Sequence, residues 1–327
     1  MQAAAAVTPG AAALAGLGIK NIQKRRWYIL WLLLPGIILL AAISLYPFFW
    51  LIWMSLHEVL MKPHTPDRWV GFSNYLAMFR NPEYRRGWAL LAEYTAIAMT
   101  LEMGLGMLVA VLINRLRRIE KALTTIVLMP MMMAPVVVGL LWAFLYNASF
   151  GWVFWALRSL HILGTDTLLG NPSLALFAVI ATDVWEWTPL IILILLAGLK
   201  GVPKDQIEAV WVDGASGWQT FLRVTIPNLK PLLVIAILLR FMDNVRIIDH
   251  FIALTGMGGP ASATKILPIF LYERAFTFFQ LGLGAAVALT LLIVTIVVGN
   301  YVVKAFTAKD VEAKKALLEE AAVEGKG

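Results

Sequence analysis

Six long apolar stretches divide the chain. They lie at roughly residues 27–54, 88–113, 123–147, 174–198, 229–253 and 281–306. Each is long enough to cross a membrane as a helix, because about 20 apolar residues span a hydrocarbon core of about 30 Å. The stretches are continuously apolar and do not alternate with polar residues, which argues against a transmembrane β-barrel. The pattern therefore predicts an all-α, polytopic membrane protein with a six-helix transmembrane bundle.

Composition agrees with this prediction and excludes several functions. With 60% hydrophobic and 14% charged residues among 327, the chain is too apolar for a soluble globular protein of this length. It has no cysteine, which excludes disulfides, thiolate metal sites and cysteine nucleophiles. The histidines lack the spacing of metal ligands, so we expect no metal site and ordinary surface positions for His57, His64, His161 and His250.

The placement of charge predicts the orientation of the chain. The net charge is +7, and the basic residues cluster at the ends of the apolar stretches, which membrane topology explains better than nucleic-acid binding. With the N-terminus inside, the cytoplasmic segments hold 17 Lys and Arg residues and the outer segments hold 8. The positive-inside rule then places both termini in the cytoplasm. We expect no nucleic-acid partner.

The spans divide the chain into three regions. Residues 1–26 form a cytoplasmic N-terminal tail, whose first part lacks the basic start of a cleaved signal peptide and is expected to be flexible. Residues 27–306 form the transmembrane domain, embedded in the lipid bilayer. Residues 307–327 mix Lys, Glu, Ala and Leu and are expected to form a solvated helix in a cytoplasmic C-terminal tail.

Small residues and prolines predict how two of the spans pack. Gly104 and Gly106 in the second span permit the close approach of another helix. Pro130 and Pro135 should bend the third span, because proline removes a helical hydrogen bond. Notched and bent helices of this kind can pack around a cavity.

Ionisable residues gather in three spans. An unpaired carboxylate in hydrocarbon costs several kcal/mol, so Glu93 and Glu102 in the second span should face the bundle interior or water. In the fifth span, Asp243, Arg246 and Asp249 are spaced to form a ladder of ion pairs along one helical face. Such charges either fix helix register or line a hydrophilic translocation path.

We assign a candidate path to the fourth and fifth spans. Trp185 and Trp187 suit an aromatic belt at the membrane interface, or one of them stacks on a sugar ring while Asp183 or Glu186 accepts hydroxyl hydrogen bonds. The candidate residues of the substrate path are Asp183, Trp185, Glu186, Asp243, Asn244 and Arg246.

A polar interruption separates these two spans, at about residues 199–229. Gly214 and Gly217 suit a tight bend between two short helices. Ile207, Val210 and Trp211 give the first of these helices an apolar knob that is too small to bury itself. A knob on the cytoplasmic side predicts docking into a groove of a soluble partner.

The order of residues in this interruption resembles a known loop. Glu-Ala-x-x-x-Asp-Gly-Ala, followed by an aromatic residue, Ile-Pro and a second Pro, is similar to the coupling loop of binding-protein-dependent ABC importer permeases. One departure is Val210, where the loop of that family has a second Ala. The resemblance implies docking on an ATPase through Ile207, Glu208, Ala209, Trp211, Asp213, Gly214, Ala215, Gly217, Ile226 and Pro227.

Five further segments resemble the sugar subclass of these permeases, which includes the maltose-type and glycerol-phosphate-type systems. They are residues 69–75, 130–145, 149–151, 254–260 and 272–279. The resemblance implies a permease subunit of type I in a bacterial inner membrane. It would pair with a second homologous permease, sit on two ATPase subunits and receive a carbohydrate or polyol from an extracytoplasmic binding protein. Because the chain lacks a Gly-x-x-x-x-Gly-Lys-Ser/Thr phosphate loop, we expect no cofactor and no enzymatic activity in it, with ATP and Mg bound by the ATPase partners.

Two other classes of function remain to be compared with the importer. An ion- or proton-coupled secondary transporter would use intramembrane carboxylates such as Glu102, Asp183 and Asp243 directly, but it has no ATPase to dock. A membrane-embedded enzyme needs a nucleophile or metal constellation that the spans lack. Within the importer class, neutral sugars or polyols are favoured, since a sugar phosphate would call for an unpaired cation such as Arg240 or Arg246.

Overall fold

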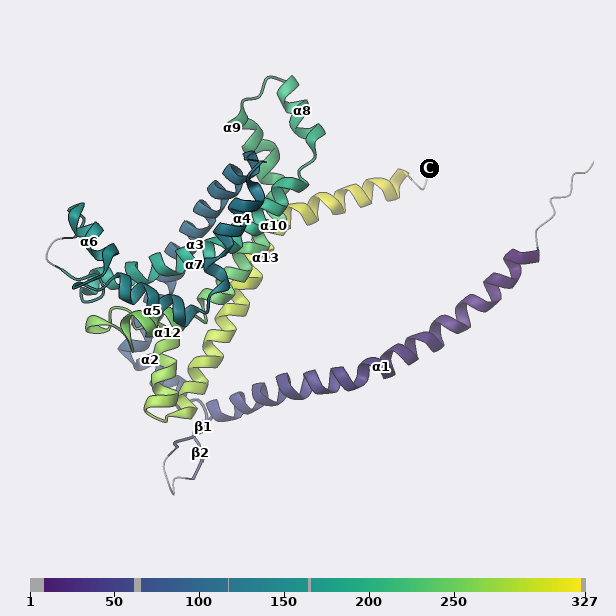
Figure 1. Cartoon of the computed structure of the whole chain (residues 1–327). Helices are drawn as coiled ribbons and strands as arrows, with labels where there is room; N and C mark the ends of the chain where they lie inside the picture. The colour runs from purple at the N-terminus through teal and green to yellow at the C-terminus, as the bar shows by residue number, and fades with distance from the viewer. Residues whose placement is uncertain (1–8, 62–65, 117, 164–165, 325–327) are drawn as a thin grey trace, which may run out of the picture. The chain divides into compact units, whose positions relative to one another are not determined.

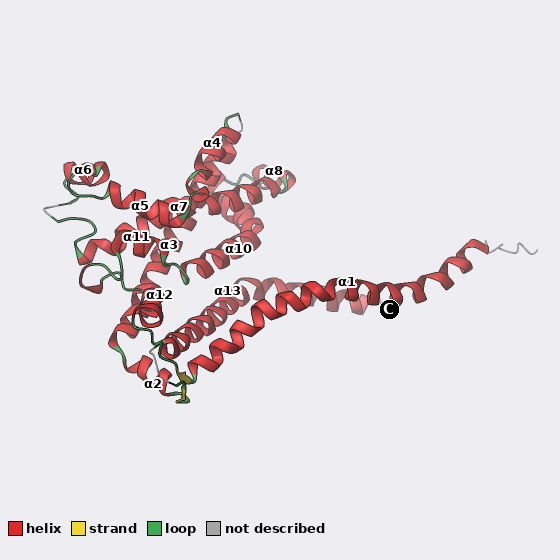
Figure 2. Ribbon diagram, turned by 60° about the horizontal axis from the view of Figure 1, so that its bottom comes forward, coloured by secondary structure: helices red, strands yellow, loops and turns green. Residues whose placement is uncertain are grey.

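The computed structural model describes the backbone of residues 9–61, 66–116, 118–163 and 166–324, with side chains from residue 31 to residue 306 (Figures 1 and 2). His64 lies outside the described residues. The chain divides into two units, Met1–Met54 and Ser55–Gly327. In both units the secondary structure is almost entirely helical (Figure 2), which confirms the all-α prediction.

In the part of the first unit that the structure describes, the chain forms a single helix, α1 (Pro9–Ser55). Its portion from Trp31 to Ser55 is long and apolar enough to cross a membrane. The helix starts inside the segment that we expected to be flexible and continues through residue 26 without a break. Proline is favoured at a first helical position, and the four alanines among residues 11–15 are strong helix formers, which accounts for the early start.

The second unit contains the other helices and one short strand pair. Strands β1 (His57–Glu58) and β2 (Arg68–Trp69) pair antiparallel, with His57 opposite Trp69. The helices, in chain order, are α2 (Ser73–Arg80), α3 (Pro82–Arg115), α4 (Glu120–Leu128), η1 (Pro130–Met132), α5 (Pro135–Leu145), α6 (Trp152–Ser159), α7 (Pro172–Gly201), α8 (Lys204–Val212), α9 (Gly217–Thr220), η2 (Phe221–Thr225), α10 (Ile226–Asn244), α11 (Asp249–Thr255), η3 (Pro260–Ser262), α12 (Leu267–Tyr272), η4 (Glu273–Thr277) and α13 (Leu281–Glu324).

In the described part of the chain, five helical segments are long and apolar enough to span a membrane, one fewer than the six predicted spans. The predicted continuous span at 123–147 is wrong: it is divided into α4, η1 and α5, of which α5 has only 11 residues. Pro130 begins η1 and Pro135 begins α5, so the two prolines break this span and do not merely bend it.

The fifth predicted span ends earlier than expected. Helix α10 ends at Asn244, and the chain turns before α11 begins at Asp249. A ladder of charges along one continuous helix from residue 243 to residue 249 is therefore impossible.

The last helix, α13, continues to Glu324, which confirms a helical backbone in the C-terminal tail.

Helices α3 and α7 pack along each other at the centre of the second unit. Both begin with Asn-Pro, and the Asn81 and Asn171 side chains accept hydrogen bonds from the N–H groups two residues on, at 2.9 and 2.8 Å. A β-carbon at Gly106 would lie 2.6 Å from Cγ2 of Ile191, which confirms that this glycine permits close packing. Gly104 differs, because nothing lies within 4 Å of the equivalent position.

Helix α7 is the most enclosed of the membrane-spanning helices. In its apolar window, 67% of the residues are buried, against 28% for α3. The buried polar side chains of α7 therefore need a partner from a neighbouring helix.

Candidate functional site

The polar interruption at 199–229 folds into a helical hairpin that projects from one end of the second unit (Figure 1). Helix α8 ends at Val212, and Gly214 follows with a φ of +81°. The N–H of Gly214 donates to the carbonyl of Trp211 at 3.0 Å, and that of Ala215 donates to Val210 at 3.1 Å. These bonds satisfy the last carbonyls of α8 through a backbone conformation that favours glycine. The predicted bend between two short helices is confirmed.

Side-chain hydrogen bonds hold the hairpin in shape. Ser216 and Gln219 form a capping box at the start of α9, with distances of 3.3 Å and 2.8 Å. Nδ2 of Asn228, in α10, donates to Oε1 of Gln206, in α8, at 2.9 Å. The hairpin is therefore joined to the start of α10 by a side-chain contact as well as by the backbone.

The hairpin presents its apolar residues to the outside. The exposed fraction is 58% for Trp211 and 67% for Trp218, which stacks on Phe221 at 5.6 Å. Sequence reasoning missed Val212 and Trp218, although both are large apolar residues beside the predicted set. Of the ten residues in that set, seven are exposed and three are half-buried. The half-buried ones are Ile207, Ala215 and Ile226, and the exposed ones are Glu208, Ala209, Trp211, Asp213, Gly214, Gly217 and Pro227.

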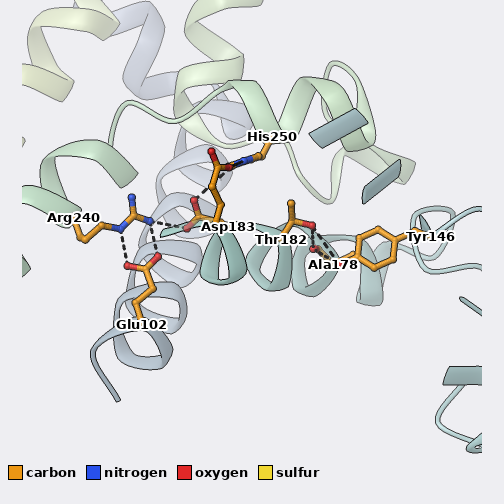
Figure 3. A network of polar contacts seen from close by, with 8 residues as sticks. Glu102, Tyr146, Ala178, Thr182, Asp183, Arg240 and His250 are labelled. Atoms are coloured by element: carbon orange, nitrogen blue, oxygen red, sulfur yellow. Dashed lines mark hydrogen bonds and ion pairs between the residues drawn. The ribbon is translucent and has the colours of Figure 1, made fainter. Parts of the chain in front are cut away.

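A second region is a buried network of charged side chains (Figure 3). Nε and Nη2 of Arg240 donate to the two carboxylate oxygens of Glu102 at 2.6 and 2.5 Å. Nη2 also donates to Oδ2 of Asp183 at 2.8 Å. The arginine is 1% exposed and both acids are fully buried. This bidentate geometry is the strongest form of arginine–carboxylate pairing.

His250 extends the network toward a third acid. Its Nδ1 lies 3.5 Å from Oδ1 of Asp183, and its Nε2 is in hydrogen-bond contact with Oε2 of Glu186. The order Glu102, Arg240, Asp183, His250, Glu186 thus joins α3, α10, α7 and α11. One turn earlier in α7, the hydroxyls of Thr182 and Tyr146 both donate to the carbonyl of Ala178, at 3.0 and 3.2 Å (Figure 3).

The network is a clamp between helices. A buried ion pair contributes little net stability compared with an apolar pair, but removing one partner leaves a buried charge and costs about 3–5 kcal/mol. The five side chains therefore require α3, α7, α10 and α11 to keep their relative positions. We call Glu102, Asp183, Glu186, Arg240 and His250 the ion clamp.

The clamp answers two questions that the sequence left open, on the partners of Arg240 and Glu102, and overturns one expectation, the surface position of His250. Arg240 is not an unpaired cation, since Glu102 and Asp183 both neutralise it. His250 is not a surface histidine, since it is fully buried; His161 is exposed and His57 is half-buried. Glu102 has its partner inside the bundle, as expected, whereas Glu93 lies on an exposed face of α3.

The other predicted path residues do not join the clamp. Asp243 and Arg246 form an ion pair at 2.6 Å, with 70% of the arginine side chain exposed. In the described part of the chain, Arg246 makes no second pair with Asp249, because the helix has already ended; the predicted ladder is wrong. Asn244 is fully buried, and Trp185 is partly exposed with its ring edge-on to Trp142 at 5.5 Å.

A polar cleft of about 260 Å³ adjoins the clamp. Arg240 and His250 belong to both, and Asp243 and Arg246 form another part of the cleft wall. Trp187 also lines it and stacks under the Arg240 guanidinium at 5.2 Å, whereas Trp185 is not among the lining residues. The cleft thus offers donors and acceptors on paired charges together with an aromatic side chain, a combination suited to a polar uncharged ligand.

An all-α membrane bundle with an exposed helical hairpin and a polar intramembrane cleft has the organisation of a transport permease. Residues 102–309 match the model of the family described as binding-protein-dependent transport system inner membrane component, and the chain belongs to this family. It is an ABC importer permease, a multi-pass membrane subunit of a transport system; this membership favours the importer over the secondary transporter.

Relatives match over nearly the whole chain. The trehalose/maltose transport system permease protein MalF of Thermococcus litoralis is 33% identical over 83% of this chain and 90% of its own length. The trehalose transport system permease protein SugA of Mycobacterium tuberculosis is 29% identical over 89% of this chain and 92% of its own length.

A solved structure shares the fold. A chain from the crystal structure of a bacterial ABC transporter involved in the import of the acidic polysaccharide alginate superposes with a TM-score of 0.76, at 21% identity. The superposition covers 88% of this chain and 98% of that one.

Proposed function

We propose that this chain carries a neutral carbohydrate or polyol across the membrane and takes the driving force at its helical hairpin. The observation that carries the proposal is the course of α10. This helix starts at the hairpin, to which Asn228 ties it, and ends at the cleft, where Arg240 joins the ion clamp. Its 19 residues cover about 28 Å, so a displacement of the hairpin reaches the cleft through one rigid element.

The proposed driving force comes from partner subunits. Two ATPases would bind ATP and Mg and receive the exposed apolar side chains of the hairpin, Trp211 and Val212 among them, in a groove. When the ATPases close, the hairpin would move as a lever, and α10 together with the clamped helices would rock as a body. A second, homologous permease would complete the path on the other side of the cleft.

The proposed partner on the outer side is an extracytoplasmic binding protein. The family description supports it. So does a second structure of the alginate transporter, solved in complex with an alginate pentasaccharide-bound periplasmic protein, whose fold superposes with a TM-score of 0.72 at 20% identity. We further propose a bacterial inner membrane as the location, with both termini in the cytoplasm, on the basis of the charge distribution.

The charges of the cleft favour an uncharged substrate. Each arginine that lines it has a carboxylate partner, Glu102 and Asp183 for Arg240 and Asp243 for Arg246. A phosphate group would have to displace one of these carboxylates. Relatives include permeases named for trehalose and maltose and one named for sn-glycerol-3-phosphate, from Agrobacterium fabrum at 31% identity. Of these two kinds of substrate, the neutral sugars suit this cleft better, because its arginines are already paired with carboxylates.

The first test is affinity purification of the tagged chain from its native membranes in mild detergent. We expect an ATPase with a phosphate-binding loop and a second permease to co-purify. Purification of the chain alone, as a stable homo-oligomer, would overturn the importer assembly.

The second test is uptake of labelled trehalose, maltose and glycerol 3-phosphate into proteoliposomes that contain the purified complex and its binding protein. Glu208→Ala should abolish uptake and leave the amount of assembled protein unchanged. Asp205→Ala removes an acid from the same exposed helix outside the predicted docking set and is the matched control. Normal uptake by the Glu208 variant would remove the docking role from the hairpin.

A further inference from the structure

A groove with an apolar wall runs along α3 at the end that meets the helical hairpin. Its volume is about 490 Å³, and one wall is formed by Gly104, Met107, Leu108 and Val111. The other wall is Trp218 and Phe221, the stacked pair of the hairpin. An adjoining cavity of about 400 Å³ shares Val111, Phe221 and two further residues with it, so the two are parts of one groove.

The groove is open where an apolar chain would enter it. Nothing lies within 4 Å of a β-carbon placed on Gly104, in contrast to Gly106 two residues later, which is tightly packed against α7. Leu108 is 56% exposed, although it lies on a membrane-spanning helix. The sequence suggested that both glycines serve helix packing, and the structure shows that Gly104 contributes space.

The other end of the groove, at the end of α3, carries a positive charge. Arg115 is the last residue of α3, is exposed and lines both parts of the groove. Its side chain makes no ion pair or hydrogen bond with any other residue that the structure describes. Lys200, in the last turn of α7, is by contrast paired with Glu120.

The length of the groove matches one leaflet. From Gly104 to Arg115 the helix rises about 16 Å, at 1.5 Å per residue. Half of a hydrocarbon core of about 30 Å is about 15 Å. An acyl chain along the apolar wall would therefore end near the bilayer centre when its head group lies beside Arg115. Trp218, beside the same end, is a residue type that concentrates at the membrane interface.

We propose that the groove binds one anionic phospholipid from the leaflet on the hairpin side, with its phosphate on Arg115 and one acyl chain against Gly104, Leu108 and Val111. Basic pockets between membrane-spanning helices are a recurrent site for acidic lipid head groups. The guanidinium favours a lipid over a helix of a second permease, because a helix would fill the apolar wall and leave the charge without an anion. The lipid would lie between α3 and the hairpin, so that it braces the base of the element that receives the driving force.

Native mass spectrometry of the complex purified from membranes tests the site. The probes are dioleoyl phosphatidylglycerol and dioleoyl phosphatidylcholine, which have the same chains and differ in net charge. We expect one phosphatidylglycerol to be retained in preference to phosphatidylcholine, and Arg115→Gln to weaken its binding about tenfold, the effect of losing one charged hydrogen bond. Arg118→Gln removes a nearby exposed charge that does not line the groove and should leave binding unchanged.

A second variant tests the apolar wall independently of charge. Gly104→Leu should fill the open space and reduce retained phosphatidylglycerol at least as strongly, whereas Gly36→Leu, at another open glycine of a membrane-spanning helix, should not. Equal retention of the two lipids, or full retention in Arg115→Gln, would overturn the site. Loss of a co-purifying permease from Gly104→Leu, with lipid binding unchanged, would show that a partner helix fills the groove.

Discussion

The helical hairpin and the ion clamp are built in opposite ways. In the hairpin, the bonds that set the shape join residues close in sequence, such as Ser216 with Gln219 and Gly214 with Trp211. In the clamp, Arg240 reaches Glu102 across 138 positions and Asp183 across 57. The hairpin exposes its apolar residues, whereas the clamp buries its charges. An exposed hairpin can be shaped by local order alone, whereas a buried network of charges needs contacts between several helices.

The strongest way to test this comparison is to break the clamp. Arg240→Leu leaves the buried carboxylates of Glu102 and Asp183 without their cation and should destabilise the protein by about 3–5 kcal/mol, which is a large part of a typical folding free energy. We expect a marked loss of protein from the membrane and a lower midpoint in thermal unfolding followed by size-exclusion chromatography. Arg246→Leu, which breaks the exposed pair with Asp243, should change stability by less than about 1 kcal/mol. Similar losses of stability in the two variants would show that the buried clamp is no more important for stability than the exposed ion pair.

A substitution in the hairpin should reduce transport more than it reduces the stability of the whole bundle. Gly214→Val places a β-branched side chain at a φ of +81°, where the strain is about 1–2 kcal/mol, although nothing within 4 Å obstructs its β-carbon. Uptake in proteoliposomes should fall sharply, with thermal unfolding of the bundle nearly unchanged. Gly201→Val, at an unobstructed glycine at the end of α7, is the control. Equal uptake by the two variants would show that transport does not depend on the geometry of the turn at Gly214.

The contact that joins the two regions should have an intermediate effect. Gln206 and Asn228 share one hydrogen bond between α8 and α10, which contributes about 0.5–1.5 kcal/mol. Gln206→Ala and Asn228→Ala should each lower substrate uptake per ATP hydrolysed, and the double variant should be no worse than the more affected single variant. Additive losses would mean that the two side chains act separately.

The smallest effect is expected at the rim of the cleft. Asp243→Ala frees the guanidinium of Arg246, and exposed ion pairs contribute only about 0.2–1 kcal/mol. Uptake of glycerol 3-phosphate should therefore rise a few-fold relative to that of trehalose. An unchanged ratio over a panel of neutral and anionic substrates would exclude this face of the cleft from the path.

Sequence reasoning was accurate where the physical constraint is local. The bend at Gly214, the two short helices around it and the all-α character follow from backbone conformation and from apolar runs, which are visible in neighbouring residues. The prolines at 130 and 135 signalled a distortion, but periodicity alone does not show whether a helix bends or breaks. The predicted ladder failed for the same reason, since no local signal ended α10 at Asn244.

By itself, the sequence determined that this protein resides in a membrane, that it is helical and that it contains an exposed hairpin of two short helices, because hydrophobicity, proline and glycine act on their immediate surroundings. Only the tertiary structure decided which buried charges are partners. Glu102, Asp183, Glu186, Arg240 and His250 each have several possible partners in the sequence, and the choice depends on which helix faces lie together. The same holds for Gly104 and Gly106, where one opens a groove and the other closes a helix contact, because a difference of two residues turns them to different sides of α3.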